Sequence, residues 1–213
     1  MPRRKTVIGR GAFGSYIPQE EHAWEVLKRI LSRGHPLTED ALFLCMWNIL
    51  RCNNSLILKC VRQSSDVGGY QNFSFSPDID LLEVRPNGAV IGYELKGHRR
   101  GTSGIEPPTY YEGVDQALAY LVNPTASPIS KSFAGSIFDQ VYLVHPEGTQ
   151  VEKLASLVER CTPLGIIVVG RTGTKELVKP KPNPYLDNDL KKYFLSRLGA
   201  FEKYKTWRVN PIQ

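Results

Sequence analysis

Residues 76–97 read SPDIDLLEVRPNGAVIGYELKG, and this stretch decides the fold. Two apolar runs flank the turn sequence RPNG at 85–88. An Asn-Gly dipeptide between strand-like residues is the strongest short signal of a β-hairpin. We therefore predict two antiparallel strands, over 77–85 and 88–96, joined by a tight turn.

The predicted hairpin gathers acidic side chains and a lysine at one end. The end of the second strand returns beside the start of the first, which makes Asp78 a neighbour of Glu94 and Lys96. Side chains alternate along a strand, so Glu94 and Lys96 project from one face. Asp80 follows Asp78 on the same face, where we expect it to act as a supporting acid.

Two carboxylates and an amine in this arrangement suit metal-dependent hydrolysis. Carboxylates are hard oxygen ligands that hold Mg²⁺ or Mn²⁺. Such an ion polarises a phosphoryl oxygen and lowers the pKa of a bound water. The lysine can orient that water, help deprotonate it or stabilise the developing charge. The alternative is an ordinary ion pair at a sheet edge, because charge pairs on strands are common.

The strings PDID and YELKG resemble the signature of the PD-(D/E)XK nuclease superfamily, and residues 76–97 are most similar to archaeal Holliday-junction resolvases. The resemblance implies an α/β fold with a mixed central β-sheet flanked by helices, in a restriction-endonuclease-like core of order α-β-β-β-α-β. It also implies an Mg²⁺-dependent (or Mn²⁺-dependent) deoxyribonuclease in which Asp78 and Glu94 hold the metal and Lys96 is the catalytic lysine.

The same resemblance implies a partner and an assembly. The expected substrate is DNA with a branched, Holliday-junction-like structure, which the protein would cut as an endonuclease. Two symmetric cuts need two sites, so a homodimer is expected. The overall likeness suits an archaeal virus or its host.

Residues 19–33 predict a first helix from an apolar stripe at helical spacing. In the resolvases that this chain resembles, the first helix supplies an acid that completes the metal site. Glu20 lies at the edge of the stripe and fits that place best, with Glu21 and His22 as alternatives. Acids in a first helical turn also interact well with the helix dipole, which is the purely structural interpretation.

A helix over 109–122 follows the predicted site. Gln116 and Tyr120 lie four residues apart and share one face of it. A Gln-x-x-x-Tyr helix after Glu-x-Lys resembles the extra motif of the RecB-like branch of the superfamily, which implies that both residues approach the site and the DNA. Helix packing for Tyr120 and solvent exposure for Gln116 are the alternatives.

Two basic segments suggest contact with a phosphate backbone. The net charge of +6 favours an acidic polymer as partner. One segment is the glycine-rich loop directly after Lys96, and the other is an N-terminal arm over 1–18. Solvated segments are the alternative in both places. The candidate phosphate contacts are His98, Arg99, Arg100, Arg3, Arg4 and Lys5.

The remaining patterns extend the same sheet. The stretch ALFLCMWNIL at 41–50 is apolar on most sides, which predicts a buried helix.

We divide the chain into the arm 1–18, a nuclease-like domain 19–179, and a C-terminal helix with a basic and aromatic tail, 180–213, packed on the same domain. The other predicted elements are a helix over 38–52, strands over 55–62, 136–146 and 165–170, a helix within 148–165, a proline-rich link over 175–188 and a last helix over 186–199.

Composition limits the remaining choices. No apolar run approaches the ~20 residues that cross a bilayer, and the N-terminus lacks the apolar stretch of a secretory signal. We therefore expect an intracellular, cytoplasmic protein with no membrane partner and no organic cofactor. Two other functions stay open: a non-catalytic nucleic-acid-binding or assembly protein on a nuclease fold, and a RecB-like exonuclease.

Overall fold

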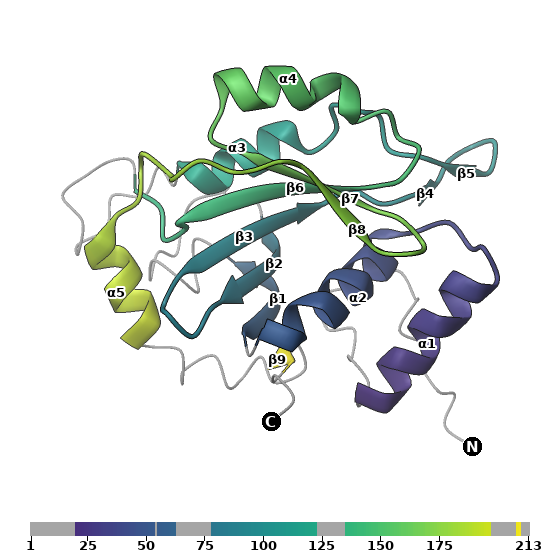
Figure 1. Ribbon diagram of the computed structural model, residues 1–213, viewed down its shortest axis with the longest axis horizontal. Helices are drawn as coiled ribbons and strands as arrows, with labels where there is room; N and C mark the ends of the chain where they lie inside the picture. Colours follow the sequence, from purple (N-terminus) through teal and green to yellow (C-terminus); the bar gives the residue numbers. More distant parts are fainter. Residues whose placement is uncertain (1–19, 54, 63–77, 123–134, 197–207, 210–213) are drawn as a thin grey trace.

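The computed structural model of the 213-residue chain describes residues 20–53, 55–62, 78–122, 135–196 and 208–209 (Figure 1). The helices are α1 (Glu20–Ser32), α2 (Glu39–Leu50), α3 (Val114–Leu121), α4 (Glu152–Cys161) and α5 (Asn188–Ser196), with a 3-10 turn η1 (Arg51–Asn53). The strands are β1 (Leu56–Arg62), β2 (Asp78–Val84), β3 (Val90–Leu95), β4 (Arg99–Arg100), β5 (Ile105–Glu106), β6 (Gln140–Pro146), β7 (Gly165–Val169), β8 (Thr174–Val178) and β9 (Arg208–Val209).

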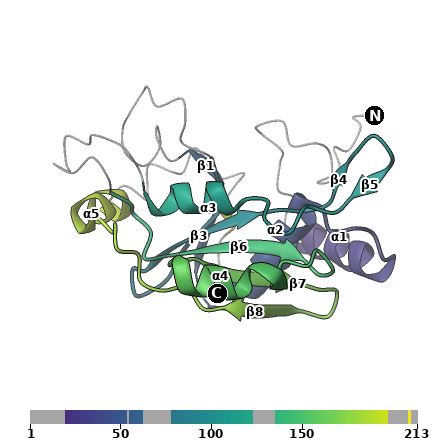
Figure 2. The same ribbon diagram turned by 90° about the horizontal axis from the view of Figure 1, so that it is seen from above.

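Seven of these strands form one mixed sheet in the order β8-β7-β6-β3-β2-β1-β9. The pairs β3–β6 and β6–β7 are parallel, and the other neighbours are antiparallel. Parallel neighbours need a crossover connection, and α3 and α4 provide the two crossovers. Both lie on one face of the sheet, while α1 and α2 cover the other (Figures 1 and 2). The predicted α/β class with a helix-flanked mixed sheet is thus confirmed.

The β2–β3 hairpin forms where the sequence predicts it. The N–H of Arg85 donates to the carbonyl of Ala89 at 2.9 Å, and the N–H of Gly88 donates to the carbonyl of Arg85 at 2.9 Å. Gly88 has a φ of 79°, a left-handed conformation that glycine adopts without strain. The turn sets Val84 opposite Val90, and this register fixes every later pair along the two strands.

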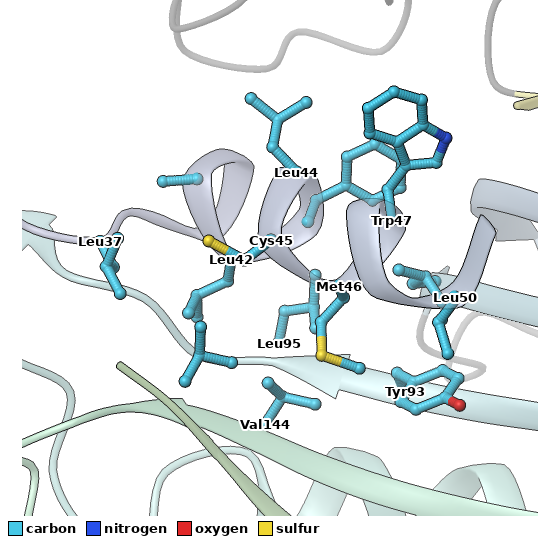
Figure 3. Packing of buried hydrophobic residues seen from close by; sticks show 14 of the residues in the cluster. Leu37, Leu42, Leu44, Cys45, Met46, Trp47, Leu50, Tyr93, Leu95 and Val144 are labelled. Atoms are coloured by element: carbon cyan, nitrogen blue, oxygen red, sulfur yellow. The ribbon is translucent and has the colours of Figure 1, made fainter. Parts of the chain in front are cut away.

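A hydrophobic core lies on each face of the sheet. On one side, Leu42 and Met46 of α2 point toward Tyr93, Leu95 and Val144 on the strands (Figure 3). Leu44 and Trp47 point the other way from α2 and are also buried (Figure 3). This helix is therefore apolar on most sides because it is covered on most sides, as predicted. On the opposite face, helices α3, α4 and α5 cover the sheet with buried Tyr120, Leu121, Val158, Leu190 and Phe194.

Two predictions about connecting segments are wrong. Part of the proline-rich link is strand β8, which pairs antiparallel with β7 at the sheet edge. Its sequence TKELV is polar because most of it is exposed. The loop after Lys96 contains the small hairpin β4–β5. The arm at 1–18, with Arg3, Arg4 and Lys5, lies outside the residues that the structure describes.

No helix in the described ranges is long and apolar enough to cross a membrane.

Candidate active site

The register of the hairpin places Asp80 beside Glu94. Leu81 pairs with Tyr93, so one step farther along both strands brings Asp80 opposite Glu94. The N–H of Leu95 donates a 2.9 Å hydrogen bond to Asp80 Oδ2, which holds this carboxylate at the end of β3. The acid beside Glu94 is therefore the one that we expected in a supporting role.

Asp78 lies farther out, as the first residue of β2, where it pairs with Arg62 of β1. Its side chain is outside what the structure describes, so its role as a metal ligand stays a prediction. The same holds for Glu20, Glu21 and His22. They begin α1, and their side chains are not described.

Glu94 is the centre of a buried polar cluster. One of its oxygens, Oε1, lies 2.5 Å from Lys96 Nζ in an ion pair. The other, Oε2, accepts a short hydrogen bond from the hydroxyl of Tyr120. The same hydroxyl accepts from the N–H of Asp80 at 3.2 Å. Tyr120 is fully buried, so it fixes the positions of Glu94 and Asp80 and has no surface with which to touch DNA.

A third acid reaches this end of the sheet from α2. A Cβ on Gly97 would lie 2.2 Å from the backbone nitrogen of Glu39, so the chain after Lys96 runs in direct contact with the start of that helix. The N–H of His98 also donates to the carbonyl of Leu37 at 2.8 Å, and its ring Nδ1 lies 3.2 Å from the same oxygen. His98 thus joins the hairpin end to α2.

The electrostatics of the cluster show that negative charge is in excess. Burial, then the charge of Glu94, raises the pKa of Asp80 well above its usual range. Burial raises the pKa of Glu94, although Lys96 opposes this. Glu39 is exposed overall, but partial burial of its carboxyl group, followed by the charge of Asp80, raises its pKa as well. Three carboxyl groups therefore share one lysine.

Lys96 remains an ammonium ion in this setting. Burial alone would lower its pKa, but the charges of Glu94, Asp80 and Glu39 outweigh that effect and raise it. A lysine held in this way donates hydrogen bonds and stabilises negative charge. In the metal-free chain, donor and charge-stabilising roles are therefore the ones that its surroundings favour.

The donor set fits Mg²⁺ or Mn²⁺. Asp80 and Glu94 offer hard carboxylate oxygens, and Mg²⁺ is commonly bound through one or two carboxylates while it keeps several waters. The excess negative charge favours a divalent cation at this place. Within the ranges that the structure covers, no three His, Cys, Asp or Glu side chains form a group that could hold a metal.

The other predicted residues lie around the cluster in different ways. Arg99 forms an ion pair with Glu112, and Arg100 is exposed on β4. Gln116 is half-buried on α3, one helical turn before Tyr120. Of the predicted catalytic set, the structure therefore brings together Glu94, Lys96 and Tyr120.

Sequence reasoning missed Glu39. It follows Thr38, whose Oγ1 accepts from the N–H of Ala41 at 3.3 Å and caps α2. Acids in the first turn after such a cap are common for local reasons. The one signal that separates Glu39 from them is position, because α2 is the helix that directly precedes β1.

No protein-family model and no curated protein matches this sequence. Among solved structures, a protein of unknown function from Silicibacter pomeroyi is similar with a TM-score of 0.43 and 11% sequence identity. The similarity covers 72% of this chain and 78% of that one. A likeness of this degree defines neither a family nor a function.

Proposed function

We propose that this chain is a metal-dependent DNA endonuclease with a PD-(D/E)XK core. The observation that carries the proposal is the gathering of Asp80, Glu94 and Lys96 at one end of a β-hairpin, with Lys96 Nζ 2.5 Å from Glu94. The order α2-β1-β2-β3-α3-β6 supports it, because a restriction-endonuclease-like core has the order α-β-β-β-α-β.

Asp80 and Glu94 would hold Mg²⁺ or Mn²⁺. Glu39 of α2 would supply the helix acid that the resemblance implies for the first helix. Asp78 and Glu20 remain further candidate ligands. A bound ion supplies Lewis acidity at a phosphoryl oxygen and a water of lowered pKa. Hydrolysis of the phosphodiester bond then depends on the groups that fix and neutralise the reacting atoms.

The chain's own residues divide that work. Lys96, as an ammonium ion, orients the attacking water and stabilises charge on the phosphoryl oxygens. Tyr120 fixes Glu94 through its hydroxyl, and the N–H of Leu95 fixes Asp80. By the same proposal the protein acts as a homodimer on branched, Holliday-junction-like DNA.

The direct test is cleavage by a matched pair of lysine variants. Lys96 and Lys191 both form a largely buried ion pair with an acid. Lys191 lies on α5, far from the end of β3 (Figure 1), and pairs with Asp139 just before β6. With Mg²⁺ or Mn²⁺ and supercoiled, four-way-junction and single-stranded DNA, Lys96→Ala should lose cleavage while Lys191→Ala keeps it. Equal activity of Lys96→Ala and the wild type would refute the proposal.

Two other outcomes identify the alternatives. If the wild type cleaves none of these substrates but binds DNA tightly, it is a non-catalytic binding or assembly protein. Degradation that starts only at DNA ends would indicate a RecB-like exonuclease.

A further inference from the structure

The turn between β5 and α3, residues 109–113, exposes two adjacent tyrosines. Tyr110 and Tyr111 are 39% and 59% exposed. Their rings meet edge to face, with centroids 5.2 Å apart and planes at 90°. Tyrosine rings are large and mostly apolar, so an exposed pair of them is typical of a surface that binds a ligand or a partner molecule. Ile105 on β5 is also exposed, at 60%.

This turn lies against the candidate active site. Gly113 has a φ of 86°, and a Cβ built there would lie 2.7 Å from Cγ of Lys96. The backbone of the turn therefore rests on the stem of the proposed catalytic lysine. Tyr111 is two residues earlier, so its Cα is at most about 7.6 Å from the Cα of Gly113.

The turn is held by two side chains from outside it, Arg99 and His145, and by a hydrogen bond within it. The carboxylate of Glu112 accepts from Arg99 and, at 3.2 Å, from the N–H of Thr109. Its carbonyl oxygen lies 2.9 Å from Nε2 of the buried His145, which donates because a carbonyl only accepts. A pair of exposed rings held in this way loses little conformational entropy on binding a ligand.

The charge beside the tyrosines favours a polyanion as the ligand. Arg99 and Arg100 lie on β4, next to the turn, and Arg99 is 58% exposed although it is paired with Glu112. Aromatic faces beside guanidinium groups bind strands whose bases are unstacked, because the base faces of a continuous duplex are hidden.

We propose that Tyr110 and Tyr111 form a stacking platform for unpaired nucleotides next to the cleavage site. The platform makes the protein prefer single-stranded or locally unpaired DNA to continuous duplex. This inference rests on the proposed function, because the strand on the platform is the one presented to Lys96, Glu94 and Asp80.

The test uses DNA oligonucleotides with 2-aminopurine, whose fluorescence falls when it stacks on an aromatic ring. Binding is measured with EDTA present, so no cleavage is needed. Wild type and Tyr111→Phe should quench the signal at an unpaired position, whereas Tyr111→Ala should not and should bind the single strand roughly ten-fold more weakly. Its affinity for continuous duplex should change less than about two-fold. Tyr185→Ala is the control, because Tyr185 is an exposed tyrosine (47%) just before α5.

The remaining outcomes separate the two proposals. Equal losses for single strand and duplex, or quenching that survives in Tyr111→Ala, would overturn the platform. So would a change in sedimentation from dimer to monomer in Tyr111→Ala with unchanged quenching, which would make the turn a protein interface. If quenching depends on Tyr111 but the wild type cleaves no DNA, the platform stands and the nuclease proposal fails.

Discussion

The β2–β3 hairpin carries a fully buried glutamate near each end, and the two have very different surroundings. Near the turn, Glu83 Oε1 accepts from Ser55 at 2.6 Å and from Arg85 at 3.3 Å, and Oε2 accepts from Tyr93 at 2.7 Å. All three of these neighbours are donors, and one of them is a cation. This carboxylate is neutralised and saturated within the fold.

Glu94, at the other end and on the opposite face, shares its site with a second, half-buried carboxylate. It has a lysine and a tyrosine as donors, but Asp80 beside it and Glu39 nearby leave negative charge in excess. Burial alone therefore does not mark a functional acid. What distinguishes Glu94 from Glu83 is its incomplete neutralisation, and under the proposed function a divalent cation would complete it.

The largest expected effect is on DNA cleavage, which should depend on Glu94 and not on Glu83. Glu94→Gln should lower DNA cleavage by at least ~10²-fold, because it removes the proposed metal ligand and the partner of Lys96. Glu83→Gln should cleave as well as the wild type, per folded molecule at 25 °C. Initial rates on a four-way junction, with circular dichroism to confirm folding, make the comparison. Parallel losses in both variants would show that the hairpin acts only as a scaffold.

The free energy of unfolding should depend more on Glu83, near the turn, than on the carboxylates at the other end of the hairpin. In Glu83→Gln an amide N–H₂ replaces an oxygen that faces donors only, and the charge opposite Arg85 is lost. We expect a loss of about 3 kcal/mol in the free energy of unfolding. Urea denaturation followed by tryptophan fluorescence measures it. A loss below about 0.5 kcal/mol would mean that the network around Glu83 is loose in solution.

At the other end, a substitution should stabilise the metal-free protein. Asp80→Asn removes the half-buried carboxylate beside Glu94, but the new amide oxygen can still accept from the N–H of Leu95. We expect a gain of about 1 kcal/mol at pH 8 in EDTA, from the same urea titration. A loss of stability at that pH would argue that Asp80 and Glu94 are not in repulsion.

The gain should depend on pH in a defined direction. The pKa of Asp80 is raised in the folded protein. In the unfolded chain an aspartate has a pKa near ~4, so above that pH the folded state keeps a proton that the unfolded chain has released. The contribution of this group to stability is complete below that pH and is lost as the pH rises through the raised pKa. The difference between Asp80→Asn and the wild type should therefore grow from pH 5 to pH 8. A constant difference would contradict the assignment.

The smallest effect concerns Arg85, the cation of the saturated end. Its side chain is 38% exposed and lies 3.3 Å from Glu83, so solvent screens the pair. Arg85→Gln should cost about 0.5 kcal/mol in the urea titration, because Ser55 and Tyr93 still donate to Glu83. A cost as large as that of Glu83→Gln would show that the charge matters more than the hydrogen bonds.

Much of this arrangement can be predicted from sequence, because local signals fix it. The RPNG turn gives the hairpin, and Glu94 and Lys96 follow from alternation. The exact pairing does not follow, because a shift of two residues in the register of the hairpin would bring Asp78 opposite Glu94 instead of Asp80. The closure from Arg85 to Ala89 selects Asp80, and no pattern within the strands distinguishes it from Asp78.

Long-range contacts account for the rest. Glu39 joins the site through a backbone contact at Gly97, which no periodicity reveals. Strand β8 resembles a linker because an exposed edge strand needs few apolar residues. The two-residue strands β4 and β5 are too short to produce an alternation.

Gly97 has a consequence for how this protein tolerates change. The two hydrogen atoms on its α-carbon are all that fits against the backbone of Thr38 and Glu39 at the start of α2. Any larger residue would push the helix and the hairpin apart, and with them the acid on one and the amine on the other. A saturation screen for function should therefore find position 97 among the least permissive in the chain, even though it has no side chain with which to touch an ion or a nucleotide.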